Sequence, residues 1–125
     1  MSLPTDHHPI PYDHDRPRVG IVFPQTEFRG SADDLRRFVT AIEALGYHHL
    51  LAYDHVLGAS RQTRPEWTGP YSSDDPFQEP FVLFAFATAV APRLEYVSGV
   101  LILPQRQTAL VAKQAANVDF LTRGR

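Results

Sequence analysis

The stretch Tyr47-His-His-Leu-Leu-Ala-Tyr-Asp-His55 decides how this chain folds. It follows Gly46, a residue type that commonly ends a helix, and its apolar middle leads to an acid beside an imidazole. A short apolar run of this kind is typical of a buried parallel strand, here Tyr47 to about Asp54. Ligands bind at the carboxyl ends of such strands, so Asp54 and His55 are candidate site residues.

The same order of strand and helix is found on both sides of this stretch. Before it, Arg18–Phe23 is short and apolar and predicts a first strand. Ser31 with Asp34 three residues later forms a capping-box pattern, which predicts a helix that ends at Gly46. After it, Leu94–Leu103 predicts a third strand closed by a proline corner at 104–106. Thr108 is the expected cap of a helix with apolar positions at Leu110, Val111, Ala115, Val118 and Leu121.

The middle helix is expected to start at Pro80, because proline suits the first helical position and Glu79 precedes it. Residues 81–90 are apolar around nearly the whole circumference. Such a helix has to be covered on two sides, one by the sheet and the other by a partner helix, which a second subunit can supply. Pro92 is expected to end this helix.

Three consecutive strand–helix units predict an α/β fold with parallel strands. Three strands alone leave both sheet edges unpaired, and closing a (β/α)8 barrel takes about 250 residues. We therefore expect residues 18–125 to be the first three units of a TIM (β/α)8 barrel, incomplete by itself, preceded by a flexible proline-rich arm at residues 1–17. A small flavodoxin-type sheet is the rival, although it usually has five strands. Residues 23–30 lack the glycine pattern of a nucleotide-binding loop.

Composition excludes several classes of function. The 125 residues carry a net charge of −2, which is not the basic surface that nucleic acid or anionic membranes require. Without cysteine there is no disulfide framework and no thiolate nucleophile. No apolar run approaches the length of a membrane span, and the start of the chain shows no signal pattern, so we expect a cytoplasmic protein. His7, His8 and His14 lie in the arm; binding of a divalent metal is one interpretation of them, but a polar tail is favoured, so no metal site is expected.

Residues 56–75 are a long polar connection at the carboxyl end of the second strand. Compact domains seldom keep some twenty irregular residues without a function, and a lid over an active site is a common one. We expect such a lid, with Trp67 and Tyr71 as its walls; a plain surface loop is the alternative.

Several stretches occur in order at these strand ends. They are Phe23-Pro-Gln-Thr-Glu-Phe28, Leu51-Ala-Tyr-Asp-His-Val56, Asp75-Pro-Phe-Gln-Glu-Pro-Phe81, Gly99-Val-Leu-Ile-Leu-Pro-Gln-Arg106, Ala112-Lys-Gln-Ala-Ala116 and Asp119-Phe-Leu-Thr-Arg-Gly-Arg125. Together they resemble the luciferase-like monooxygenase family, especially its branch that uses the deazaflavin F420. The resemblance covers about residues 18–125, which is under half of a usual member.

The resemblance implies a TIM barrel, often dimeric, that binds FMN or F420 at the carboxyl end of its strands. It implies that Asp54 and His55 lie beside the cofactor ring, with His55 as proton donor or ring-binding group and Asp54 as its orienter. An Asp–His pair that only caps a strand is the alternative. It also implies a non-prolyl cis peptide near the end of the third strand, matched to the Val100–Leu101 bond, as a backstop for the ring. Gln105 and Arg106 lie at the same end, where substrate contact and helix capping are both open.

The function implied is hydride transfer between F420 and an organic substrate by the N-terminal portion of an oxidoreductase. An FMN-dependent monooxygenase is the alternative within the family. A different class is a catalytically silent interaction module that docks to another copy or to a chain carrying the missing barrel strands. Most contacts to the cofactor tail are expected from later strands, so the 125-residue chain by itself is expected to bind either cofactor weakly or not at all.

Overall fold

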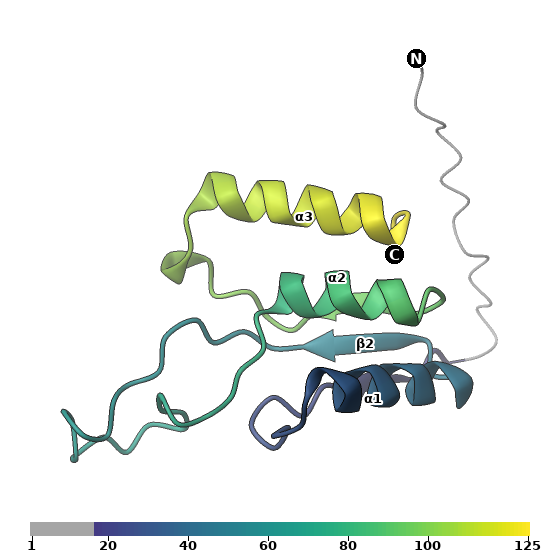
Figure 1. Cartoon of the computed structure of the whole chain (residues 1–125). Coiled ribbons are helices and arrows are strands. Elements are labelled where there is room, and N and C mark those ends of the chain that lie inside the picture. The colour runs from purple at the N-terminus through teal and green to yellow at the C-terminus, as the bar shows by residue number, and fades with distance from the viewer. Residues whose placement is uncertain (1–16) are drawn as a thin grey trace.

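The computed structural model describes residues 17–125, and Figure 1 shows their arrangement. Strand and helix alternate along the chain, as the sequence predicts. The elements are β1 (Gly20–Val22), α1 (Ala32–Ala44), β2 (His49–Ala52), α2 (Pro80–Val90), β3 (Glu95–Ser98), the short 3-10 turn η1 (Leu103–Gln105) and α3 (Thr108–Thr122). Residues 1–16, and with them nearly all of the expected arm, lie outside the described part.

The three strands form one parallel sheet in the order β1-β2-β3. In its register Ile21 pairs with Leu50, and Leu50 pairs with Tyr96. The prediction of an α/β fold built from three parallel strand–helix units is therefore confirmed. At the far side of β3, the backbone N–H of Tyr96 donates to the carbonyl of Arg125 at 2.8 Å, so the last residue lies alongside this strand.

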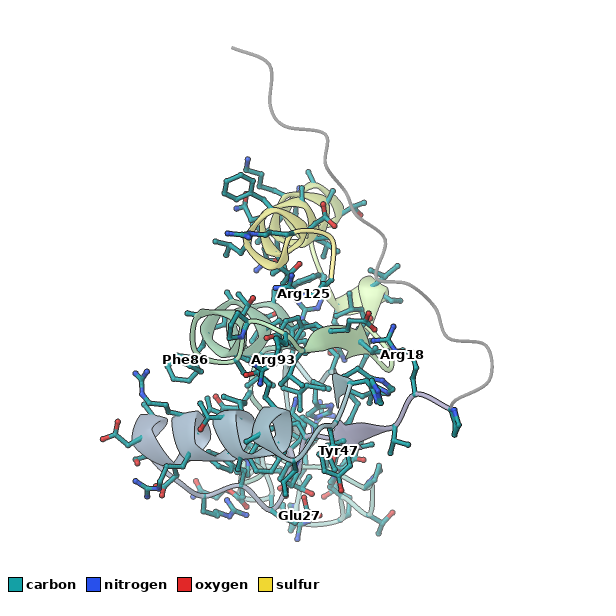
Figure 2. All side chains as sticks on the ribbon, turned by 90° about the vertical axis from the view of Figure 1, so that its right-hand side faces the viewer. Arg18, Glu27, Tyr47, Phe86, Arg93 and Arg125 are labelled. Carbon is teal, nitrogen blue, oxygen red and sulfur yellow. The ribbon has the colours of Figure 1, made fainter. Side chains whose placement is uncertain are left out.

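The hydrophobic core lies between one face of the sheet and the helices. Side chains alternate along a strand, so Phe23, Leu50 and Ala52 face the helices and are fully buried. Figure 2 shows α1 and α2 together on this side of the strands. The alternate positions Val22 and Val97 lie on the opposite face and are 56% and 39% exposed. The apolar pattern of the strands thus has only one of its two faces covered within residues 17–125.

Helix α1 forms as the local sequence predicts. The Ser31 hydroxyl accepts from the backbone N–H of Asp34, and the Asp34 carboxylate accepts from the backbone N–H of Ser31. This capping box satisfies two N–H groups that a helix start otherwise leaves free. The turn after the helix places Gly46 at φ +85°, a left-handed conformation that glycine adopts without a side-chain clash.

Helix α2 starts at Pro80, and the Glu79 carboxylate caps it by accepting from the N–H of Val82 at 2.8 Å. The helix contacts α1 on one side and α3 on another. The second cover that its apolar composition requires therefore comes from this chain's own α3. Val82 nevertheless remains largely exposed.

Three local predictions were wrong in detail. All three strands are shorter than expected, because the parallel ladder pairs only Gly20–Val22, His49–Ala52 and Glu95–Ser98. Helix α3 is capped by the side chain of Gln107, one residue before the expected Thr108. Its apolar positions Leu110 and Leu121 are exposed, because α3 packs against α2 and only Val118 of its predicted apolar positions packs against the core.

A non-prolyl cis peptide bond follows β3, between Gly99 and Val100. The expected position at Val100–Leu101 was therefore wrong by one residue. Gly99 lies against Leu51 of the neighbouring strand so closely that a Cβ atom there would come within 3.0 Å of the leucine side chain.

Candidate functional site

The ends of the three strands meet at one rim, and Gln25 holds two of them together. Its side chain is fully buried just after β1. The amide nitrogen donates to the carbonyls of Tyr53 at 2.8 Å and Gln78 at 2.9 Å, and the amide oxygen accepts from the N–H of Gln78 at 2.8 Å. One amide therefore ties the end of β1 to the end of β2 and to the segment that leads into α2.

A chain of charges joins the end of β2 to the end of β3. The guanidinium of Arg106 donates to both carboxylate oxygens of Asp54, from Nε at 2.8 Å and from Nη2 at 2.7 Å. Its Nη1 lies 2.8 Å from a carboxylate oxygen of Glu79 at the start of α2. The Asp54 carboxylate also accepts from the backbone N–H of Ile102 at 3.0 Å. Two-pronged pairing of this kind fixes the geometry of both partners.

The electrostatic state of Asp54 follows from these contacts. Burial works to raise the pKa of its carboxyl, but the hydrogen bonds from Arg106 and Ile102 and the charge of Arg106 outweigh burial, so the pKa lies below its ordinary value. The same pairing raises the pKa of Arg106. Asp54 is therefore an ionised carboxylate that is committed to Arg106. Among the hydrogen bonds within residues 17–125 there is none between Asp54 and His55, so the expected orienting contact is not formed.

Aromatic side chains position the imidazole of His55. The ring lies with its centroid 4.9 Å from that of Phe77 and 5.4 Å from that of Tyr71. Tyr53 packs against both of these rings and closes the cluster. The Nε2 atom of His55 is buried and has no hydrogen-bond partner within the described residues. A buried polar atom without a partner is costly, and it is a common feature of sites that a ligand completes.

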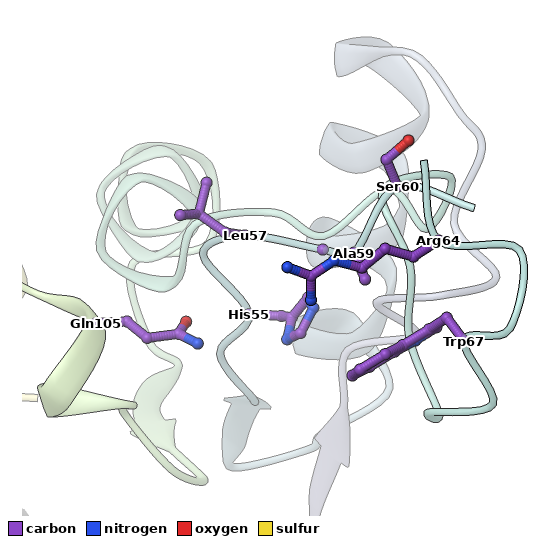
Figure 3. Close-up of a pocket in the computed structure, with 8 residues that line it drawn as sticks. His55, Leu57, Ala59, Ser60, Arg64, Trp67 and Gln105 are labelled. Carbon is purple, nitrogen blue, oxygen red and sulfur yellow. The ribbon is translucent and has the colours of Figure 1, made fainter. Parts of the chain in front are cut away.

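A pocket of about 440 Å³ opens at this rim, in front of His55. Figure 3 shows Gln105 on one side of His55 and Trp67 on the other, with the side chain of Arg64 reaching in above the imidazole. The walls come from the segment after β2 and from η1. The lining residues are His55, Leu57, Gly58, Ala59, Ser60, Arg64, Trp67 and Gln105.

The segment 56–75 has an internal structure, although it contains no helix. It folds back on itself through a bridge between Ala59 and Ser72. The indole N–H of Trp67 donates to the carbonyl of Tyr71 at 2.8 Å, and Arg29 donates to the carbonyl of Asp74 at 3.0 Å. In Figure 1 this segment extends away from the three helices between β2 and α2. Trp67 forms a wall of the pocket, as expected, whereas Tyr71 does not line the pocket and packs against the ring of His55.

The other candidate positions differ in their surroundings. Val100 is exposed and Leu101 is partly buried, and neither lines the pocket. His48 lies at the amino end of β2, where its Nδ1 contacts the backbone of Val19, far along the strand from the rim. Gln105 lines the pocket, whereas Arg106 is turned to Asp54 and Glu79.

Sequence reasoning missed Gln25, Arg64 and the Asp54–Arg106–Glu79 chain. Two signals pointed towards them. A polar residue directly after a buried strand, such as Gln25, indicates a side chain that bonds to backbone at the rim. A buried aspartate requires a cationic partner, and Arg106 is the arginine at the end of the adjacent strand. Arg64 had no signal beyond its place in the long connection.

The part of the chain that the structure describes contains neither a metal-binding cluster nor a membrane-spanning helix. Within residues 17–125 no three side chains of His, Asp or Glu come together in a way that would hold a metal ion. None of the helices in that range combines the length and the apolar composition that crossing a membrane requires. His7, His8 and His14 lie outside the described residues.

Comparison with known proteins identifies relatives. An uncharacterized protein of Mycobacterium bovis and two uncharacterized proteins from strains of Mycobacterium tuberculosis are each 37% identical over 86 residues. The match covers 65% of this chain but only 30% of each relative, so the chain spans about a third of their length. The sequence model of the family described as luciferase-like monooxygenase matches residues 11–125, which is nearly the whole sequence. The chain therefore belongs to the luciferase-like monooxygenase family.

Proposed function

We propose that the protein that carries this chain is an oxidoreductase that moves a hydride between F420 and an organic substrate. The observation that carries the proposal is the unpartnered Nε2 of His55 at the wall of the rim pocket. The family match supports an oxidoreductase or monooxygenase, and the ordered motifs favour the F420 branch.

The residues at the rim fit a planar heterocycle. Gln105 offers an amide and His55 offers a ring nitrogen that donates or accepts according to its tautomer, while Trp67, on the opposite side of His55 from Gln105, leaves an aromatic face for the substrate. When bound, F420 supplies the ring carbon that accepts or releases a hydride. His55 would meet a polar atom of the ring or hand a proton to the substrate, since imidazole exchanges protons near neutral pH.

The remaining candidate residues support this role from the rim. In the proposal Asp54 acts through Arg106 and Ile102, because its carboxylate is committed to both. That pairing holds η1 and its Gln105 at the pocket. Val100 and Leu101, which follow the cis peptide bond, are proposed as the backstop behind the ring. A cytoplasmic homo-oligomer, to which the exposed Val82 of α2 would contribute, completes the proposal.

The cofactor is tested with the whole protein as its gene encodes it. F420 and FMN are titrated separately and followed by absorbance and fluorescence, which differ between the two. We expect saturable binding of F420. Saturable binding of FMN alone, with oxygen-dependent turnover, would replace the F420 assignment by the monooxygenase. Binding of neither would overturn the proposed function.

His55 is tested by substitution to alanine. We expect F420 affinity to fall by about tenfold or more, because the ring contact is lost. His48→Ala is the matched control, since His48 lies at the other end of the same strand, and it should leave the affinity unchanged. Equal affinity in wild type and His55→Ala would remove His55 from the site.

A further inference from the structure

The charge of the rim pocket is unbalanced. Of the residues that line it, Arg64 is the one with a full charge at neutral pH, and none is an acid. The two carboxylates at the same rim, Asp54 and Glu79, are both paired with Arg106. Between residues 17 and 125, no ion pair or side-chain hydrogen bond engages the guanidinium of Arg64. The pocket therefore presents one uncompensated positive charge.

The wall beside this charge is flat and held in place. The indole of Trp67 is fixed at its N–H by the carbonyl of Tyr71. It also lies on the backbone of Gly69, where an added Cβ would come within 2.2 Å of the indole carbon Cζ2. A fixed aromatic face favours a planar partner, because little freedom is lost when the two surfaces stack.

The guanidinium of Arg64 and the imidazole of His55 line the same pocket. Figure 3 shows the Arg64 side chain extending over His55, with the ring of Trp67 next to both. A guanidinium pairs with a carboxylate through two parallel hydrogen bonds, and a single positive charge matches a single negative one. The pocket holds no second cation to balance the higher charge of a phosphate.

We propose that the substrate of this site is a planar organic acid, whose carboxylate pairs with Arg64 while its ring stacks on Trp67 and faces His55. This inference rests on the proposed function and names the class of substrate for it. Arg64 is then the residue that selects acids over neutral compounds of the same shape.

The test compares an acid with its neutral counterpart. 2-Naphthoate and 2-naphthamide are titrated by calorimetry into the whole protein, loaded with whichever of F420 and FMN binds. We expect the acid to bind at least about tenfold more tightly than the amide, as a charge-assisted hydrogen bond implies. Arg64→Gln should abolish this preference and leave the amide affinity within about threefold of wild type, and Arg64→Lys should restore part of the preference.

Arg61→Gln is the matched control, because Arg61 belongs to the same segment but does not line the pocket. It should leave the preference for the acid intact. Three results would each overturn the inference: binding of neither probe, equal binding of both, or displacement of the cofactor by the acid, which would assign Arg64 to the cofactor. The titration is repeated on cofactor-free protein, so that failure to bind either cofactor is read separately from failure to prefer the acid.

Discussion

Arg106, directly after η1, binds Asp54, just beyond the end of β2, with two hydrogen bonds, Nε to Oδ2 at 2.8 Å and Nη2 to Oδ1 at 2.7 Å. Both side chains are almost wholly buried. Sequence reasoning expected the Asp54 carboxylate to orient His55. In the structure it pairs with Arg106 and so holds the segments after β2 and β3 together at the rim. It also brings Gln105, the neighbour of Arg106, to the pocket.

Replacing Arg106 by a neutral residue should therefore lower the stability of the folded protein. Arg106→Met leaves the Asp54 carboxylate buried without its partner, and we expect the free energy of unfolding to fall by about 3–5 kcal/mol. Urea denaturation of the whole protein measures the change. The matched control is Arg37→Met, because the Arg37–Asp34 pair on α1 is exposed, at 72% and 42%, and exposed pairs contribute little to stability. A loss in Arg106→Met no larger than in the control would contradict a structural role for the pair.

The same pair should make the protein sensitive to acid. The pKa of Asp54 is lower in the folded state than the ordinary value near 4 of an unfolded chain. The folded state then binds the proton less readily, so the stabilisation is fully present above the unfolded pKa and is lost as the pH falls through the folded one. We expect the unfolding free energy of wild type to decline more steeply below about pH 4 than that of Asp54→Asn.

Urea unfolding between pH 7 and pH 3 measures both curves. The carboxyls of Asp34 and Asp75, whose pKa values are also lowered by hydrogen bonds, titrate in both proteins and cancel in the comparison. Parallel curves would show that Asp54 does not carry the effect.

The features that the sequence predicted are those whose cause is local. The capping box of Ser31 and Asp34, the left-handed Gly46 and the proline start of α2 each depend on residues within a turn of one another. The parallel order of the strands followed from the repeated pattern, and the common rim followed from the parallel order.

The features that the sequence did not predict depend on residues far apart in the chain. Gln25 and Gln78 are 53 positions apart, and Asp54 and Arg106 are 52 apart. Several polar residues follow each strand, and the pattern does not say which of them pair. For the same reason Asp54 was expected to orient its neighbour His55. Its hydrogen bonds instead go to Ile102 and Arg106, beyond the next strand. The cis bond was expected one residue later than its place at Gly99–Val100.

Gln25 should be as sensitive as the ion pair, although it carries no charge. Gln25→Leu removes two donated hydrogen bonds and one accepted one, and leaves part-buried backbone groups of Tyr53 and Gln78 without these partners. We expect a loss of about 2–3 kcal/mol in unfolding free energy. Gln62→Leu, at an exposed position of the long segment, should change stability by less than about 0.5 kcal/mol. Equal stability of the two variants would show that the Gln25 bridge does not hold the strand ends.

Gly69 and Gly46 should respond differently to alanine, because different physical constraints act on them. At Gly69 a Cβ would come within 2.2 Å of the indole of Trp67, so Gly69→Ala should displace the ring and weaken 2-naphthamide, which needs only the stacking face, by about tenfold. At Gly46 nothing lies within 4 Å, but φ is +85°, so Gly46→Ala should cost about 1–2 kcal/mol of stability and leave ligand affinity unchanged.

Calorimetry measures the ligand affinity of both variants, and urea unfolding measures their stability. The fluorescence of Trp67, isolated by comparison with Trp67→Phe, should shift in the first variant and not in the second. An unchanged spectrum and affinity in Gly69→Ala would mean that the indole is not the stacking wall of the pocket.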